Sequence, residues 1–585
     1  MRRPTVRNPE HPAPKKGERV FLLDVPYEER AIAQHFGARY FSSEGWAYTG
    51  TTLPGDLERY RPQRYSWQEW QERALLGEIT ATTPAPEPDP TTGTLTLRHD
   101  QLQDVKKVLL ARQAGAPEIL NASGVGAGKT AVTIAAIKRM AQVRNVLVIC
   151  PLAVAAGWRL HLRDMGDGGM NWCIINYEST KKLLEPPPSA KTAKRTRTKN
   201  LHTVQRGTPK VQWDVVVVDE SHYCSNPESQ RTRAIDKIVA GPAHRSAFKI
   251  NMSATAGKDP SKVSYLHRAL FWTDDLQPLS HIDAERFSKW CESHRLSVGK
   301  DSFGNALKWD PEKNGSDPDR ELERLHALLF KGNPPWAFRR MPDWPDQRRV
   351  PAPVELTWEE MDAYNADWKE FQKALAALDR KIKSSTTGKA KNALRAKGLA
   401  EQTRYRQKAG QVRAPGTAAF AAEMVTKGYQ VAISAEYLGT VNRLHEELDR
   451  LKVPTALFTG DNASTREEER IAYQRGEKKV IIYTPTEGFN LHAGETAVGG
   501  NTVPRVTVVA EPRWSPGKAL QAEGRGHRNG TDAPVYYTFA SGTVEENVIH
   551  RCIDGMRNIG KINGDDTKPF EGLKEALGVP VVFAA

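Results

Sequence analysis

The chain has 585 residues, a formal net charge of +14 at pH 7 and a pI of about 9.3. It is long enough for three or four domains, but no apolar run approaches the roughly 18 residues of a membrane-spanning helix, and its five cysteines show no C-x-x-C spacing. These features exclude membrane-embedded, disulfide-stapled and zinc-binding classes, and they predict a soluble intracellular protein. The positive charge favours a polyanionic partner, nucleic acid first and an acidic membrane surface second.

The N-terminal segment predicts a small accessory module. Residues 20–25 have the pattern of a strand, residues 28–36 that of a short amphipathic helix, and residues 40–48 that of a second strand. Four prolines in residues 80–94 indicate a semi-rigid extended linker. We therefore expect an α+β module over residues 1–79, joined by this linker to the rest of the chain.

Two stretches of this module, residues 36–40 and 45–48, combine glycine with aromatic residues. They resemble small modules attached to phage and bacterial DNA enzymes and, more loosely, the HARP domain. Large aromatic residues such as Tyr40, Trp46 and Tyr48 are more often core residues than platforms for base stacking. Both roles stay open at the level of sequence.

The segment Ser-Gly-Val-Gly-Ala-Gly-Lys-Thr at residues 123–130 follows an apolar strand-like pair and precedes an apolar helix-like run. This order predicts a phosphate-binding loop, in which backbone N–H groups face the phosphates, Lys129 reaches the β- and γ-phosphates and the Thr130 hydroxyl ligates Mg²⁺. A glycine turn that binds nothing is the alternative, since Ser123 stands where the strict pattern has glycine. The expected nucleotide-binding residues are Ser123, Gly124, Gly126, Gly128, Lys129 and Thr130.

A run of four valines at residues 215–218 ends in Asp219 and Glu220. Continuous apolar runs of this kind are typical of parallel strands covered on both faces. A carboxylate at the carboxyl end of such a strand can hold Mg²⁺, and the next one can orient the water that attacks the γ-phosphate. We assign Asp219 to the metal and Glu220 to the water, and the alternative is a capped strand end with solvated acids.

Two basic stretches could contact phosphates. Residues 183–210 contain three consecutive prolines and a cluster of lysine and arginine residues, which fits either a phosphate-contacting arm or a neutral insertion. Residues 358–405 have a helical pattern, and residues 380–408 are strongly basic against one acid, Glu401. A basic helix is usually a solvated face, but beside a motor cleft it would follow a phosphate backbone.

The order of motifs over about residues 95–555 resembles the SNF (chromatin-remodeller) branch of superfamily-two helicases. The matching stretches are Leu97-Arg98-His99-Asp100-Gln101, residues 146–152 with Trp158, Asn176-Tyr177-Glu178, Asp219-Glu220-Ser221-His222, Ser253-Ala254-Thr255-Ala256, Trp336-Ala337-Phe338-Arg339-Arg340, residues 484–491 and residues 521–530. Residues 407–415 resemble the annealing-helicase members more than the nucleosome remodellers, and a phage or bacterial origin is expected.

The resemblance implies roles for residues that composition does not reveal. It implies that Gln101 and Arg98 recognise adenine, that ATP and Mg²⁺ are the cofactors, and that the turn at Ser253 couples hydrolysis to nucleic-acid contact. It also implies arginine fingers at Arg525 and Arg528. Their spacing of three residues would place both on one side of a helix, facing a triphosphate held across a cleft.

The fold implied by the resemblance is α/β, with two RecA-like parallel-sheet lobes after the small N-terminal module. The first motor lobe is expected over residues 95–345 and binds ATP. The second is expected over residues 346–585 and carries a basic helical insertion at residues 358–410.

The function implied is that of a DNA-dependent ATPase that translocates on DNA and remodels or reanneals branched duplex DNA. The alternatives are a strand-separating helicase or the motor subunit of a nuclease or restriction complex, although no nuclease motif is evident. A nucleic-acid-binding scaffold with a decayed ATPase is a further alternative. The expected partners are DNA, double-stranded or branched, and replication or recombination proteins, in the cytoplasm of a bacterial or phage-infected cell.

Overall fold

The computed structural model describes most of the two predicted lobes and part of the N-terminal module. The described residues are 18–23, 25, 29–41, 45–60, 97–186, 207–241, 246–272, 274, 282–300, 307–332, 336–342, 347–462, 464–484, 489–495, 498–513, 515–527 and 533–577. The predicted linker at 80–94, most of the basic insertion at 183–210 and Arg528 lie outside them. No helix among the described residues is both long and apolar enough to cross a membrane.

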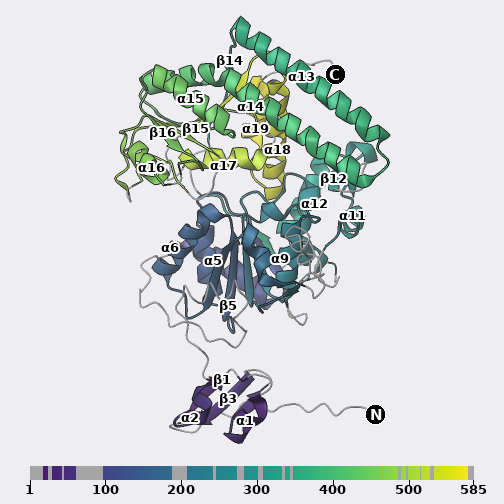
Figure 1. The fold of residues 1–585 in the computed structure, drawn as a ribbon, viewed down its shortest axis with the longest axis vertical. Helices are drawn as coiled ribbons and strands as arrows, with labels where there is room; N and C mark the ends of the chain where they lie inside the picture. Colours follow the sequence, from purple (N-terminus) through teal and green to yellow (C-terminus); the bar gives the residue numbers. More distant parts are fainter. Residues whose placement is uncertain are drawn as a thin grey trace.

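The N-terminal module is a three-stranded antiparallel sheet with one helix of six residues and one of four. Strands β1 (Arg19–Leu23), β2 (Arg39–Phe41) and β3 (Gly45–Gly50) have the order β1-β3-β2, and helix α1 spans Arg30–His35. A further turn of helix, α2, spans Gly55–Glu58. The module has a core of its own, separate from those of the lobes (Figure 1).

The prediction of a single strand over residues 40–48 was wrong. Strands β2 and β3 pair antiparallel, with Tyr40 opposite Trp46, so the chain reverses between them. The serine and glycine residues in this stretch favour a turn. Because strand-forming residues lie on both sides of them, the whole stretch has the pattern of one strand. Trp46 is buried in the core whereas Tyr40 is exposed, so the structure gives these two aromatic residues different environments.

The first lobe is a six-stranded parallel sheet with helices on both faces. Its strand order is β13-β4-β10-β9-β5-β6, and every pairing is parallel. The strands are β4 (Glu118–Asn121), β5 (Asn145–Cys150), β6 (Asn171–Asn176), β9 (Val215–Asp219), β10 (Phe248–Met252) and β13 (Ala337–Phe338). Such strands are buried on both faces, which explains their unbroken apolar runs.

Two apolar cores cover the two faces of this sheet. One lies under α4 (His99–Gln113), α5 (Lys129–Ile137) and α6 (Ala155–Met165). The other lies under α9 (Gln230–Ala240), α10 (His267–Trp272), α11 (Ala284–Ser293) and α12 (Pro318–Phe330). Because the helices enclose both faces, only the ends of the strands remain open to ligands.

The second lobe repeats this architecture. Its sheet has the order β14-β19-β18-β15-β17-β16 and is parallel throughout. The strands are β14 (Arg349–Val354), β15 (Gln430–Ser434), β16 (Thr455–Phe458), β17 (Val480–Tyr483), β18 (Arg505–Val509) and β19 (Val535–Ala540). The helices are α15 (Leu438–Arg450), α16 (Arg466–Arg475), α17 (Pro516–Gly526), α18 (Glu545–Asn563) and α19 (Lys568–Leu577). The predicted fold of two RecA-like α/β lobes is confirmed.

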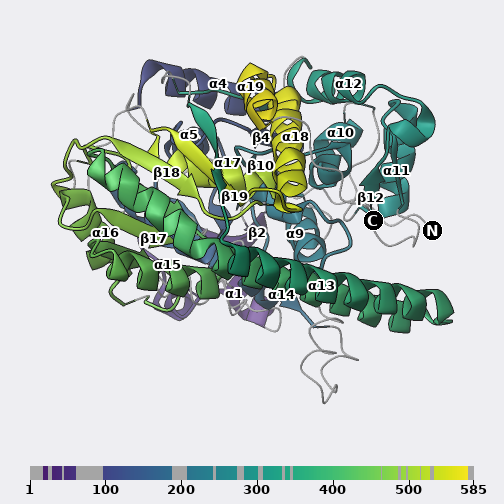
Figure 2. The ribbon, with the colours of Figure 1, turned by 90° about the horizontal axis from the view of Figure 1, so that it is seen from above.

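A long helical hairpin projects from the second lobe. Helix α13 spans Trp358–Ser384, α14 spans Gly388–Thr426, and the two pack along each other as a rod that extends beyond the sheets (Figure 2). Aromatic rings hold the base of the rod, where Phe371 stacks on Tyr405 with centroids 5.1 Å apart.

The sequence predicts a helical pattern to residue 405 and a helical insertion that ends at residue 410, whereas α14 continues through Pro415. Ala414, Ala418 and Ala421 on this last part are buried against the sheet. Apolar packing therefore keeps the helix intact although Pro415 cannot donate a backbone hydrogen bond.

The edge strand of the second sheet is fixed by a buried ion pair. Arg349 on β14 donates from Nε and Nη2 to the Glu523 carboxylate at 2.8 and 2.9 Å, and the Tyr537 hydroxyl donates to the same carboxylate at 2.5 Å. The Glu523 side chain is almost completely buried. Removal of Arg349 would leave a buried carboxylate without its counter-ion.

We therefore expect Arg349→Ala to lower the free energy of unfolding of the second lobe by about 3–5 kcal/mol, the cost of breaking a buried pair. Urea denaturation measures this change. The neighbouring Arg348 is exposed and is a matched control, for which we expect a change within about 0.5 kcal/mol. Equal losses in both variants would contradict the role of the pair.

Candidate active site

The phosphate loop lies between β4 and α5, as predicted. Gly126 and Gly128 have φ values of +79° and +83°, a backbone region that residues with a side chain rarely adopt. The Lys129 ammonium donates to the carbonyl oxygens of Ser123 and Gly124 at 2.9 and 3.0 Å. Thr130 follows in the first turn of α5 and is half-buried, so Lys129 and Thr130 both lie at the N-terminus of a helix, where anions are favoured.

Gln101 contacts the loop from helix α4. Its Nε2 donates to the Ala127 carbonyl at 3.3 Å, and its Oε1 accepts from the Arg98 backbone N–H at 3.0 Å. A Cβ atom at Gly128 would lie 2.2 Å from Gln101 Nε2, so a side chain at this position would displace the Gln101 amide from the loop. The Arg98 side chain is more exposed and pairs with Asp100 at 3.2 Å.

Arg340 supports the phosphate loop in a way that sequence reasoning missed. Its guanidinium bonds Asp104 at 2.6 Å, Asp100 at 2.8 Å and the Ala127 carbonyl at 2.6 Å. Its carbonyl accepts from the Gly124 N–H at 2.9 Å. In the sequence, residues 336–340 are recognisable only as a family motif, and the one signal for this role of Arg340 is the acidic pair on the helix that carries Gln101.

Asp219 lies at the carboxyl end of β9 and is buried. Its Oδ2 accepts from Trp158 Nε1 at 2.9 Å, and its Oδ1 accepts from the Glu220 N–H at 3.0 Å. Burial raises the pKa of Asp219 to about 6, and the Glu220 carboxylate adds to the rise, whereas Trp158 and Lys129 oppose it. In the sequence, Trp158 is recognisable only as part of a family motif. In the structure its indole N–H donates a hydrogen bond to Asp219, the predicted metal ligand.

Glu220 has a φ of +53°, uncommon for a residue with a side chain, and its carboxylate lies 3.2 Å from His222 Nδ1. Burial alone would raise the pKa of Glu220, but His222, Lys129 and Arg525 outweigh burial and hold it below its usual value. His222 Nδ1 also lies 3.0 Å from the Ser253 hydroxyl, which connects this carboxylate to the Ser-Ala-Thr turn.

The second lobe contributes Arg525 through helix α17. This helix packs closely on the phosphate loop: a Cβ atom added at Gly524 would lie only 3.2 Å from the Val125 side chain. Arg525 is buried, donates to the Phe489 carbonyl at 2.9 Å and acts electrostatically on Glu220. The structure thus brings Lys129, Asp219, Glu220 and Arg525 together, whereas Arg528 lies outside the described residues.

The residues at this site fit a hydrated Mg²⁺ ion. Mg²⁺ is usually held by one or two protein oxygens together with phosphates and water, and Thr130 and Asp219 supply such oxygens. The raised pKa of Asp219 reports buried negative charge that the neighbouring cations only partly compensate. Within the described ranges, no group of three or more His, Cys, Asp or Glu residues forms a separate metal site.

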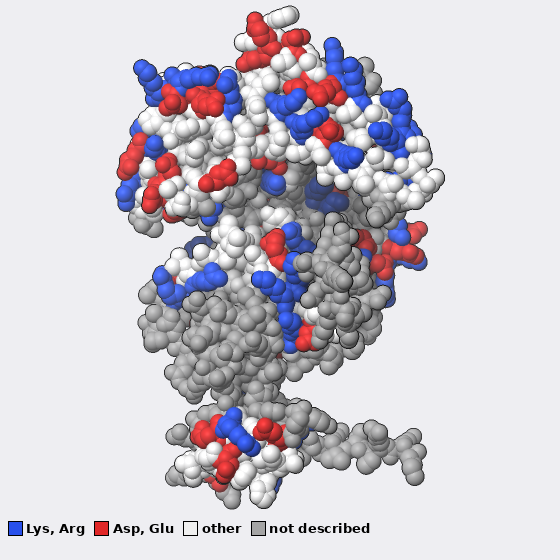
Figure 3. Space-filling model, in the orientation of Figure 1, with Lys and Arg blue, Asp and Glu red and all other residues white. Residues whose placement is uncertain are grey.

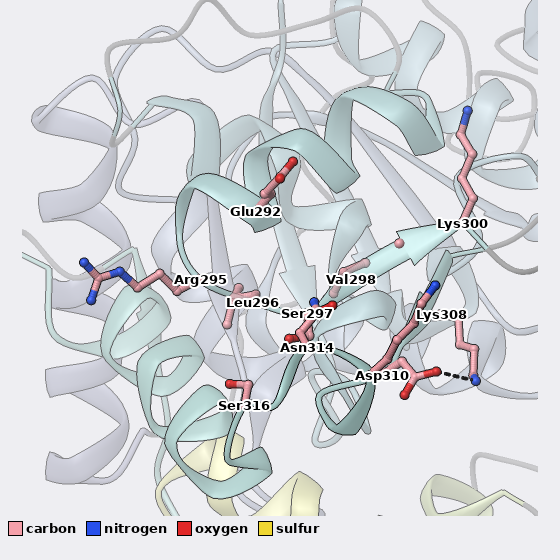
Figure 4. A pocket seen from close by; sticks show the side chains of 12 residues that line it. Glu292, Arg295, Leu296, Ser297, Val298, Lys300, Lys308, Asp310, Asn314 and Ser316 are labelled. Carbon is pink, nitrogen blue, oxygen red and sulfur yellow. Dashed lines mark hydrogen bonds and ion pairs between the residues drawn. The ribbon is translucent and has the colours of Figure 1, made fainter.

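A pocket of about 840 Å³ lies elsewhere on the first lobe, beside α11 and α12 (Figure 4). Four cations and two acids line it, and Figure 4 shows Arg295 on one side with Lys300 and Lys308 on the other. Lys308 is already paired with Asp310 at 2.7 Å. None of the predicted site residues lines this pocket.

Residues 94–258 match the family described as "Type III restriction enzyme, res subunit". This range contains the phosphate loop, the Asp219-Glu220 pair and the Ser-Ala-Thr turn. The match covers less than a third of the chain and, together with the two parallel six-stranded sheets, it agrees with the helicase-like ATPase of superfamily two that the motifs indicate.

Solved structures also resemble the chain. The SWI2/SNF2 ATPase core of Sulfolobus solfataricus in complex with dsDNA matches at 18% identity with a TM-score of 0.31, covering 84% of this chain and 99% of that one. The helicase domain of Hef from Pyrococcus furiosus matches at 12% identity with a TM-score of 0.39, covering 77% and 98%.

The raised pKa of Asp219 makes its Mg²⁺ affinity sensitive to pH. A proton and the metal compete for the carboxylate, so the Mg²⁺ concentration for half-maximal ATP turnover should rise about tenfold between pH 7 and pH 5. Trp158→Phe removes a hydrogen bond that favours the charged carboxylate, so the rise should begin at higher pH in this variant.

Mg²⁺ titrations of ATP turnover at several pH values measure both effects. ATP titrates equally in every sample, so the difference between proteins reports Asp219. Trp172→Phe removes another buried indole of the same lobe, which donates to the Asp167 carbonyl, and it should follow the wild type. Coinciding curves for Trp158→Phe and Trp172→Phe would contradict the assignment.

Proposed function

We propose that this chain is a DNA-dependent ATPase that translocates on duplex DNA and remodels or reanneals branched DNA. The observation that carries the proposal is the packing of α17 of the second lobe on the phosphate loop of the first, at Gly524 and Val125. There Arg525 and Lys129, from different lobes, both act electrostatically on the half-buried Glu220 carboxylate. A site shared in this way is complete only when the lobes are together. Nucleic acid that lies across both lobes can therefore control hydrolysis.

Each predicted site residue has a separate role in ATP hydrolysis. The loop amides and Lys129 bind the β- and γ-phosphates, and Glu220, kept ionised by its neighbours, orients the attacking water. Arg525, and Arg528 in the same motif, stabilise the charge that spreads over the transferred phosphoryl group. Thr130 and Asp219 would hold Mg²⁺, which neutralises phosphate charge when bound.

DNA is favoured as the partner by charge and shape. The face in Figure 3 is hollowed between the two lobes, and lysine and arginine side chains, with some acidic ones among them, lie along the hairpin above the hollow. Contacts to the phosphate backbone do not depend on sequence, which suits a motor that moves over any sequence. Adenine contact by Gln101 and Arg98 belongs to the same proposal.

The family match favours a second candidate, the motor subunit of a restriction or nuclease complex. A strand-separating helicase and a scaffold with a decayed ATPase are the remaining alternatives. ATP turnover measured with duplex, forked and single-stranded DNA and with RNA separates these classes, except that a translocase and a restriction motor give the same response. A translocase or restriction motor is stimulated by plain duplex, a branched-DNA remodeller most by forks, a strand-separating helicase by single strands, and a decayed scaffold by none.

Lys129→Ala, Glu220→Gln and Arg525→Gln should each lower DNA-stimulated ATP turnover by about 10³-fold or more, and Arg528→Ala should act likewise, since a finger arginine contributes about 10³–10⁵ in related enzymes. DNA affinity should change little, because these side chains face the nucleotide. Lys331→Ala is the control, since this exposed lysine caps the end of α12 and is not one of the predicted site residues. Wild-type turnover in any of the four site variants would rule out the role of that residue.

The hairpin should lie along phosphates. We expect Lys381, Lys391 and Lys397 changed together to Gln to weaken duplex binding equally for all sequences. The slope of log affinity against log salt should fall by about 0.9 for each phosphate that the variant no longer neutralises. Fluorescence anisotropy over a range of salt concentrations measures this slope. The triple change Lys331, Lys427 and Lys452 to Gln alters net charge equally and is the control. An unchanged slope would make the hairpin a solvated face.

A further inference from the structure

Arg339 joins three parts of the molecule through one guanidinium group. It follows β13 and is largely buried. It donates to the Ala122 carbonyl and, at 3.2 Å, to the Ala254 carbonyl. Its Nε and Nη2 donate to the two oxygens of Asp565, both at 2.5 Å, which is the bidentate geometry that arginine and carboxylate groups favour.

The two carbonyl groups bound by Arg339 belong to the motor site. Ala122 lies between the end of β4 and the phosphate loop, and Ala254 is the central residue of the Ser-Ala-Thr turn. The Ala254 carbonyl also accepts from Asn563 Nδ2 at 3.1 Å. One side chain therefore fixes the base of the phosphate loop relative to the turn that contacts His222 and, through it, Glu220.

Asp565 reaches this position because helix α18 is attached to both lobes. At its start, Glu545 pairs with Arg413 of α14 in the second lobe. At its end, Arg557 and Lys561 pair with Asp319 of α12 in the first lobe at 2.7 and 2.6 Å. Figure 1 shows α18 running from the second lobe toward α12.

The end of α18 is seated closely on the first lobe. His326 Nδ1 lies 3.0 Å from the Ile562 carbonyl oxygen, and a Cβ atom at Gly564 would lie 2.6 Å from His326 Cε1. Gly564 has a φ of +77° and caps the helix, which turns the chain so that Asp565 faces Arg339. A shift of α18 would therefore move Asp565 relative to Arg339.

We propose that Asp565 is a positioning residue of the motor, which transmits the seating of the second lobe on the first to the phosphate loop through Arg339. The proposal rests on the proposed function and names a coupling residue for the same site. A guanidinium in this position without its carboxylate is poorly compensated, so it reorients toward water and releases the two carbonyl groups. Closure of the lobes then no longer sets the geometry of the loop.

The test compares Asp565→Asn, Asp565→Glu and Glu575→Gln in the full-length chain. Glu575 is exposed on α19, and its change removes the same charge without contact to Arg339. We expect Asp565→Asn to reduce the ratio of duplex-stimulated to basal ATP turnover by about tenfold or more, the scale of a lost hydrogen bond to a charged group. Asp565→Glu keeps the charge and should restore part of the ratio, and Glu575→Gln should keep all of it.

Hydrogen exchange provides a readout that does not depend on activity. In Asp565→Asn, backbone amides of residues 122–128 and 253–256 should exchange faster, and in Glu575→Gln they should not. A purely stabilising ion pair would lower the melting temperature and speed exchange in α18 but leave these two segments and the stimulation ratio unchanged, and that result would overturn the proposal.

Different results would contradict the proposed function and the positioning role of Asp565. If DNA does not stimulate the wild-type protein, the proposed function is wrong, and the exchange of the two segments alone decides the role of Asp565. If DNA does stimulate it and Asp565→Asn behaves as Glu575→Gln in both measurements, Asp565 has no positioning role.

Discussion

Buried negative charge at the end of β9 is the constraint on which the site depends. Asp219 and Glu220 are adjacent carboxylates in a poorly hydrated place, and a pair of this kind is tolerated only with cations and hydrogen-bond donors around it. Lys129 comes from the phosphate loop, Trp158 from α6 and Arg525 from the other lobe. The pair is thus surrounded by elements that are far apart in the sequence. The charges and hydrogen bonds of these elements lower the pKa of Glu220, whereas burial leaves the pKa of Asp219 raised.

The parts of the site that the sequence predicts are those defined by short, local chemistry. The glycine loop with Lys129, the valine strand ending in Asp219 and the strand–helix alternation of both lobes each leave a pattern within about ten residues. The contacts of Arg340 with Asp100 and Asp104, and of Arg339 with Asp565, join residues more than 200 positions apart. Nothing in a single sequence pairs such residues, because their meeting depends on how the strands are ordered in the sheets.

The length of the hairpin helices is another feature that local sequence does not predict. Composition predicts its basic charge and much of its helix, but local propensity places the helix end before Gly410 and Pro415, which usually end helices. Burial of the alanine face of α14 against the second sheet carries the helix to Thr426. Tertiary packing therefore fixes the extent of this element, and the same packing attaches the projecting rod rigidly to the lobe.

That rigid attachment makes the hairpin a lever. From its aromatic base near Tyr405 to the start of α14 at Gly388, the helix extends roughly 25 Å at 1.5 Å per residue. For an arm of that length, simple geometry gives a tip displacement of roughly 0.5 Å for each degree by which the second lobe rotates. A rotation of the second lobe by about 7° would thus move the tip by roughly 3.4 Å, the axial spacing of neighbouring phosphates along one strand of duplex DNA.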